Sequence, residues 1–151
     1  MKDVLFWSGV IVGVLAVLVI LVAGIGAALP VKHQAVRSET YAVAAPRLWE
    51  LALALYHRRN DGTYTVQEEH APQRLVTAII RKDLPYGGSW TYDFGSKAQE
   101  TTLTITEDGE VYNPIFRFVS RFITGHEQSI DAYLAALRAD VAAESGSARP
   151  Q

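Results

Sequence analysis

The fold is decided by residues 101–123, which read TTLTITEDGEVYNPIFRFVSRFI. In the first half, Leu103 and Ile105 alternate with threonines, and because side chains alternate along a strand, this spacing predicts a strand with one apolar face. Asn113-Pro114 then supplies a capping residue and a proline suited to the first helical turn. The stretch therefore predicts a strand followed closely by a helix, with Asp108-Gly109 marking a tight turn or a bulge.

The helix continues beyond this stretch toward the C-terminus. Its apolar positions recur at helical spacing and predict one face that packs on a sheet: Ile115, Phe118, Val119, Phe122, Ile130, Tyr133, Leu134, Leu137 and Val141. Gly125 interrupts the run, and glycine costs about 1 kcal/mol relative to alanine inside a helix. We expect either a kink at Gly125 or two separate helical segments.

Three shorter segments before residue 101 predict further strands. They are TYTVQEE at 63–69, RLVTAIIR at 74–81 and SWTYDF at 89–94, with LPYGG at 84–88 as a turn or bulge. The alternation of side chains gives two sets that each share a face: Trp90, Tyr92 and Phe94, and Tyr64, Val66 and Glu68.

A strand over 36–43 and a helix over 45–57 come before these segments. The helix begins at Ala45-Pro46 and carries a leucine-rich apolar surface, and Asn60-Asp61-Gly62 ends it with turn chemistry. The order of elements predicts an α+β domain in which an antiparallel sheet of about five strands packs on a long C-terminal helix.

The N-terminal segment is of a different kind. Val4 to Leu29 contains no charged residue and exceeds the about 20 apolar residues that cross a ~30 Å hydrocarbon layer. A cleaved signal peptide is the alternative, because residues 26–28 are small enough for a peptidase, but its apolar core is typically ~7–15 residues. We expect a transmembrane helix over 4–29, a linker over 30–35, the domain over 36–144 and a disordered tail over 145–151. Basic residues flank the span almost equally on its two sides, so their distribution does not predict which side of the membrane the domain faces.

Composition excludes several classes of function. The 151 residues carry a net charge of −2 without a basic block, which argues against nucleic-acid binding. The absence of cysteine excludes disulfides, thiolate metal sites and cysteine nucleophiles. The four histidines are scattered and lack acidic partners at ligand spacing, so we expect no metal and no cofactor.

Four segments resemble bacterial SRPBCC proteins, the START-like superfamily described as polyketide cyclase/dehydrase and lipid transport proteins. They are PQRLVTAI, LPYGGSWTYDF, TLTITEDGEVYNPIFRFVSRFITGH and SIDAYLAALRADV. The resemblance covers roughly Ser38 to Val141 and is strongest from Arg74 to Leu137. It implies a helix-grip fold, in which an antiparallel sheet wraps around the C-terminal helix and a hydrophobic cavity between them holds an apolar ligand.

The sequence departs from this family in one interval. Members carry a second short helix and about two more strands before the segment that matches TYTVQEE, whereas here only HRRNDG lies between the first helix and that segment. A shortened sheet implies a shallower or more open cavity and an exposed edge that must be covered, paired or charged.

The candidate site follows from the aromatic strand face and the C-terminal helix. The residues expected to line the cavity are Tyr64, Trp90, Tyr92, Leu103, Ile105, Phe118 and Phe122, and the alternative is that they fill an ordinary core. Glu68, Glu107 and His126 are candidate polar groups of the cavity, either as an acid or base or as solvated rim residues.

Three functions remain open on these residues. We prefer a single-pass protein of the bacterial plasma membrane that binds a lipid or other small hydrophobic ligand without a catalytic residue. An enzyme of the cyclase or hydratase kind would use Glu68, Glu107 or His126 as acid or base. A remnant domain would act only in protein contact through its open sheet edge.

Overall fold

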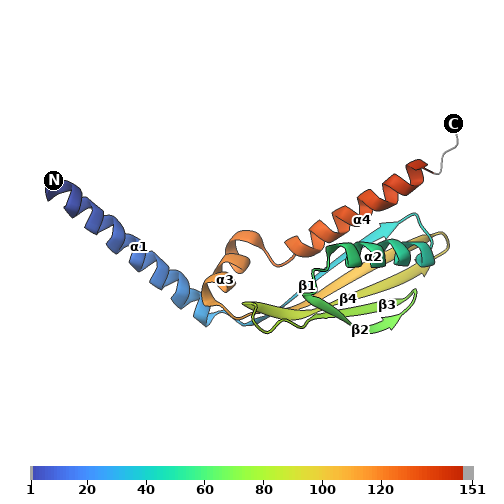
Figure 1. Ribbon diagram of the computed structural model, residues 1–151, viewed down its shortest axis with the longest axis horizontal. Helices are drawn as coiled ribbons and strands as arrows, with labels where there is room; N and C mark the ends of the chain where they lie inside the picture. Colours follow the sequence, from blue (N-terminus) through green and yellow to red (C-terminus); the bar gives the residue numbers. More distant parts are fainter. Residues whose placement is uncertain (1, 148–151) are drawn as a thin grey trace.

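The computed structural model describes residues 2–147 and has the predicted α+β architecture. Figure 1 shows a long N-terminal helix that projects away from a domain of one sheet and several helices. The elements follow in the order α1 (Lys2–Ala28), β1 (Lys32–Tyr41), α2 (Ala45–Arg59), β2 (Tyr64–His70), β3 (Arg74–Ile79), β4 (Tyr86–Lys97), β5 (Glu100–Val111), α3 (Pro114–Val119), the π-helical turn η1 (Ser120–Thr124) and α4 (Gln128–Ser147).

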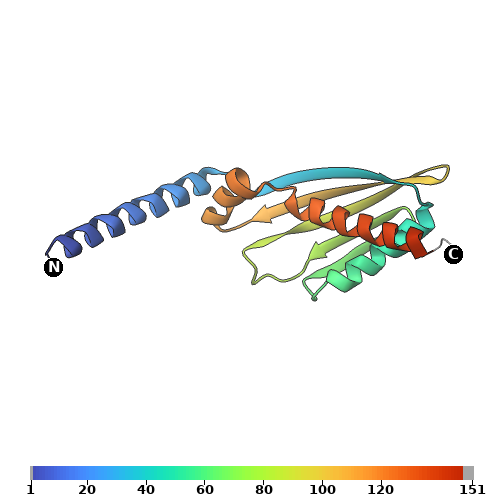
Figure 2. The same cartoon turned by 90° about the horizontal axis from the view of Figure 1, so that it is seen from above.

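The sheet of the described residues has five antiparallel strands in the order β1-β5-β4-β3-β2. Its outer face is polar, with paired hydroxyls such as Ser38 and Thr104 at 2.8 Å between Oγ and Oγ1. Helices α2 and α4 cover the inner face (Figures 1 and 2). They run antiparallel, since Arg47 near the start of α2 pairs with Glu144 and Arg59 at its end contacts Ala132. The predicted packing of the sheet on the C-terminal helix is confirmed.

The core lies between the inner face of the sheet and these two helices. Its largest fully buried apolar side chains come from three elements: Leu48 and Leu55 of α2, Leu103 and Ile105 of β5, and Ile130 and Leu137 of α4. Complete burial of such side chains stabilises a fold by about 1.5–3 kcal/mol each. The α4 residues therefore hold that helix against the inner face of the sheet.

A four-residue turn carries the chain from α2 into β2. Asn60 organises this turn: its Oδ1 accepts from the amides of Gly62 and Tyr64, both at 3.1 Å. Its Nδ2 donates to the Tyr56 hydroxyl at 3.0 Å and to the Tyr64 carbonyl at 2.9 Å. One side chain thus joins the end of α2 to the start of the edge strand.

The C-terminal helical region is divided, which is one of the two outcomes expected at Gly125. Asn113 caps α3 as predicted, accepting from the amides of Ile115 and Phe116. The π-helical turn η1 then ends at Gly125, whose φ of +75° is a backbone angle that residues other than glycine rarely adopt. This break gives α3 and α4 different directions, so the apolar face predicted from Ile115 to Val141 is not continuous.

The strand bounds differ from the prediction: β1 and β4 begin earlier, whereas β1 ends at Tyr41 and β3 ends at Ile79, two residues before their predicted ends. Lys32 to Ala35 belong to β1 instead of a linker, because they pair with Glu107 to Glu110 of β5. Asp108-Gly109 forms neither a turn nor a bulge, since β5 pairs regularly on both sides there.

Neighbouring atoms lie so close to Gly88 and Gly109 that a side chain at either position would clash with them. A Cβ on Gly88 would lie 2.2 Å from the Asp108 carbonyl oxygen, and one on Gly109 would lie 2.3 Å from the His33 ring.

Two further bounds differ from the prediction. Tyr86 to Gly88 of the predicted LPYGG turn are part of β4. At the C-terminus, residues 145–147 of the expected tail are helical, and residues 148–151 lie outside the described part of the chain.

β2 is the edge strand that the shortened sheet predicted. Its register shifts between Val66 and Glu68, so Val66 lies opposite Thr77 whereas Glu68 lies opposite Val76. Val76 and Thr77 are neighbours in β3, so their side chains point to opposite faces of the sheet. Glu68 therefore does not share a face with Tyr64 and Val66, and the prediction that it does is wrong. The bulge and the charged residues of this strand protect the edge against pairing with another chain.

α1 extends beyond the domain and contacts it at its C-terminal end (Figures 1 and 2). Within the described residues it is long and apolar enough, over Phe6–Ala28, to cross a bilayer, and only 6% of its most apolar window is buried. The contact is with α3: a Cβ on Gly26 would lie 1.8 Å from the Pro114 carbonyl oxygen. Arg117 Nη1 also donates to the Leu29 carbonyl at 2.7 Å. The end of α1 is therefore held directly against α3.

Candidate functional site

The site is built on the inner face of the sheet, where aromatic residues of β4 point toward the helices. Trp90 lies opposite Glu107, Tyr92 opposite Ile105 and Phe94 opposite Leu103. This register confirms the common face predicted for the three aromatic residues. Phe94 packs against Trp49 of α2, whereas Trp90 and Tyr92 both contact the ring of Tyr133 on α4.

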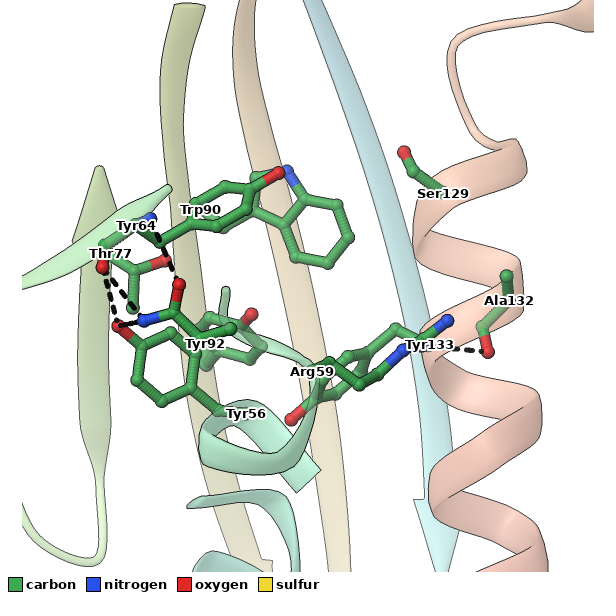
Figure 3. A pocket seen from close by; sticks show the side chains of 10 residues that line it. Tyr56, Arg59, Tyr64, Thr77, Trp90, Tyr92, Ser129, Ala132 and Tyr133 are labelled. Atoms are coloured by element: carbon green, nitrogen blue, oxygen red, sulfur yellow. Dashed lines mark hydrogen bonds between the residues drawn. The ribbon is translucent and has the colours of Figure 1, made fainter. Parts of the chain in front are cut away.

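A cavity of about 260 Å³ opens beside these rings, between the sheet, the end of α2 and the start of α4. We call it the central cavity (Figure 3). It is lined by Tyr56, Arg59, Asn60, Tyr64, Thr77, Trp90, Tyr92, Ser129, Ala132 and Tyr133. Five of the ten are aromatic, so a ligand here would meet ring faces and edges from both the sheet and the helices.

Few polar groups of the central cavity are free to bind a ligand. The Tyr133 hydroxyl donates to the Ala52 carbonyl at 2.8 Å, and Asn60 is engaged in its turn. Burial raises the pKa of Tyr92 and of Tyr133, so both phenols stay neutral. Arg59 is the charged side chain among the lining residues, and its Nη1 lies 3.4 Å from the Ala132 carbonyl oxygen at the rim.

A second cavity of about 470 Å³ adjoins the first at the end of the domain next to α1 and α3. We call it the proximal cavity. Tyr64, Trp90 and Ser129 belong to the walls of both cavities. The proximal wall also includes Phe116 of α3 and the glycine-rich ends of β4 and β5. Together the two cavities form a trough along the inner face of the sheet.

An acid and two histidines meet in the proximal cavity. His33 Nε2 lies 3.5 Å from Glu107 Oε1, and the His33 and His126 rings stack with centroids 3.9 Å apart. Ser129 Oγ donates to Glu107 Oε2 at 3.0 Å. Burial raises the pKa of Glu107, against the opposing effect of this hydrogen bond, and burial lowers the pKa of His33 and of His126. All three shifts favour neutral groups, which suits proton transfer better than binding of an ion.

The structure brings together five of the residues expected from the sequence. Tyr64, Trp90 and Tyr92 line the central cavity, and Glu107 and His126 line the proximal cavity. Leu103 and Ile105 are 0% exposed and fill the core beneath the trough. For these two residues the alternative prediction, that they fill an ordinary core instead of lining a cavity, agrees with the structure.

Three expected residues lie elsewhere. Glu68 is on the outer face of the sheet, where its Oε1 lies 3.2 Å from Arg74 Nε. Phe118 of α3 and Phe122 of η1 contact each other with tilted rings, whose centroids are 4.9 Å apart, and α3 packs beside α1. Neither phenylalanine lines the cavities described above, because the break at Gly125 turns α3 and η1 away from the sheet.

Sequence reasoning missed several lining residues. Tyr56 and Tyr133 were assigned only to apolar helix faces, although both faces had to meet the aromatic strand. His33 was placed in the linker, because the residues from Lys32 to Ala35 alternate too weakly to predict the strand that pairs with β5. Ser129 and Thr77 carried no sequence signal, because small hydroxyl residues are common everywhere.

Solved structures provide the comparison with known proteins. Mll3558 from Rhizobium loti is 15% identical with a TM-score of 0.52, over 70% of this chain and 96% of that one. A conserved protein from Geobacillus kaustophilus is 12% identical with a TM-score of 0.57, over 73% of this chain and 95% of that one. Ara h 8.0201 is 7% identical with a TM-score of 0.52, over 74% of this chain and 99% of that one.

No protein-family profile and no curated protein sequence matches the chain. Identities this low carry information on architecture alone. These similar solved structures include helix-grip folds, and the match covers 96% of Mll3558 and 99% of Ara h 8.0201. The domain that follows α1 therefore has a helix-grip fold with a five-stranded sheet.

Proposed function

We propose that the chain is a shortened member of the SRPBCC, or START-like, superfamily that α1 anchors in a membrane and that binds a lipid or another small hydrophobic ligand. The observation that carries this proposal is the central cavity with its aromatic wall. Ligand pockets are typically ~300–1,000 Å³, mostly apolar, with a few placed polar groups. The central cavity of about 260 Å³ is close to the lower end of that range, and the adjoining proximal cavity adds space for a longer molecule.

The proposed anchor rests on α1. Its uncharged segment over Phe6–Ala28 has 23 residues, which span about 35 Å at 1.5 Å per residue and so exceed the ~30 Å hydrocarbon layer. With 6% of the apolar window buried, the side chains lack the packing partners that a core helix would have within the described chain. The bacterial plasma membrane is the proposed location, and a bilayer beside the trough would supply apolar ligands directly.

The second candidate is an enzyme that uses the proximal cavity for acid–base chemistry. The observation that favours it is the contact of Glu107 with His33, which stacks on His126 beside the trough. Glu107→Gln and His126→Asn separate the two functions. A binding protein keeps its ligand unchanged in both variants, whereas an enzyme converts added ligand in the wild type and loses that conversion in the variants.

Native mass spectrometry of the full-length protein released from detergent tests the binding function. We expect a reproducible small-molecule adduct on the wild type. Ala132→Phe should remove it by filling the central cavity, because Ala132 is an exposed residue of the cavity wall. Ala135→Phe is the matched control, because Ala135 is exposed on the same helix but does not line either cavity. No adduct on the wild type, or an equal adduct on both variants, would contradict the proposal.

A further inference from the structure

The segment of α3 and η1 exposes a cluster of large apolar side chains. Phe116 is 49% exposed, Phe122 59% and Ile123 70%. We call these three residues the α3–η1 surface. Elsewhere in the domain, helices α2 and α4 bury their large apolar residues against the sheet. An exposed cluster of this kind marks an interaction site.

The position of this surface is fixed by α1. The backbone of Pro114 touches α1 at Gly26, and Arg117 binds the carbonyl of Leu29 (Figure 1). Because the apolar segment of α1 is only about 5 Å longer than the hydrocarbon layer, its last turn lies near the membrane boundary. Gly26 belongs to that last turn, so α3 is held at the depth where acyl chains meet headgroups.

The charges of the segment match an anionic lipid surface. Residues 112–125 read YNPIFRFVSRFITG and include no acidic residue, whereas Arg117 and Arg121 are basic. Arg121 is exposed next to Phe122. Exposed aromatic and aliphatic residues with interspersed arginines are the composition of helices that lie in the bilayer interface.

We propose that α3 and η1 lie in the interfacial layer of the bilayer that α1 crosses, with the α3–η1 surface among the upper acyl chains and Arg121 at the headgroup phosphates. This inference rests on the anchoring role of α1. It adds a second, independent contact with the membrane that holds the domain in one orientation. Since Phe116 also belongs to the wall of the proximal cavity, that end of the trough lies at the membrane surface.

Site-directed spin labelling tests the proposal, because the 151 residues include no cysteine and each introduced label site is unique. The probe is a vesicle of phosphatidylcholine and phosphatidylglycerol. Single-cysteine variants F122C and I123C report on the α3–η1 surface. L15C reports on α1, and K97C reports on the exposed β4–β5 hairpin at the far end of the sheet.

We expect labels at 15, 122 and 123 to be more accessible to oxygen than to a water-soluble nickel complex, with the oxygen-to-nickel ratio several-fold above that of the label at 97. A label at 15 in the hydrocarbon together with labels at 122 and 123 in water would overturn the interfacial position and leave the anchor intact. A label at 15 in water would overturn the anchor and this inference with it. The substituted positions are exposed, so folding is preserved, and near-ultraviolet circular dichroism of each variant checks that it is.

Discussion

Asn60→Ala should destabilise the domain strongly, because one side chain makes four hydrogen bonds in the turn between α2 and β2. Three of these bonds are partly buried and involve Tyr56 and Tyr64, whereas the bond to the Gly62 amide is exposed and water can replace it. At about 0.5–1.5 kcal/mol for each of the three partly buried bonds, the expected loss is about 1.5–4.5 kcal/mol. At ~4 °C per kcal/mol for a domain of this size, that loss lowers Tm by about 6–18 °C.

Thermal unfolding of the full-length protein in detergent micelles, followed by near-ultraviolet circular dichroism, measures this loss. Asn113→Ala is the matched control, because Asn113 also accepts two backbone N–H bonds but does so at an exposed helix start. Removal of such a cap costs typically ~1 kcal/mol. Asn60→Asp keeps the acceptor oxygen and loses both donated bonds, so its Tm should lie between those of Asn60→Ala and the wild type. If Asn60→Ala lowers Tm no more than Asn113→Ala does, the turn is not held by the Asn60 side chain.

Three further predictions concern the core, the α1–α3 contact and the proximal cavity. Leu137→Ala should cost about 2–5 kcal/mol in chemical unfolding, because Leu137 is 0% exposed and its loss leaves a cavity; a cost below about 1 kcal/mol would contradict its place in the core. Gly26→Val should force α1 away from Pro114 and speed amide hydrogen exchange in α3, whereas Gly24→Val, which meets no atom within 4 Å, should leave that exchange unchanged. Burial raises the pKa of Glu107, because the folded protein disfavours its charged form. The folded protein therefore loses stability as the pH rises from the usual carboxyl pKa through the raised pKa of Glu107. Glu107→Gln should therefore raise Tm relative to the wild type at pH 8 and leave it similar at pH 4, and an equal difference at both values would contradict the raised pKa.

The elements with strong periodicity were predictable from the sequence. The strict alternation of Trp90, Tyr92 and Phe94 survives in β4, because neighbours on both sides hold the strand in a regular register. The order of strands and helices was enough to predict the architecture. The cap at Asn113 was also predictable, since Asn-Pro before an apolar run is a local signal.

The remaining features depend on tertiary contacts that no local pattern shows. His33 is in a strand because β5 pairs with it, although Lys32 to Ala35 alternate weakly. Glu68 changed faces through a bulge, and bulges leave no clear trace in sequence. Phe122 followed the helical spacing of the core residues, but the π-helical turn and the break at Gly125 direct it away from the sheet. The errors at Glu68 and Phe122 therefore fall at irregularities of the backbone.

Photo-crosslinking in nanodiscs tests the central claim most directly. The full-length chain is reconstituted with a fatty acid that carries a diazirine on its acyl chain, and the crosslinked peptides are mapped by mass spectrometry. Uptake of the ligand predicts crosslinks to Tyr64, Trp90 and Tyr133 in the central cavity, which Ala132→Phe removes and Ala135→Phe retains. Crosslinks confined to α1, with none on the cavity residues, would contradict the claim that this trough binds an apolar ligand.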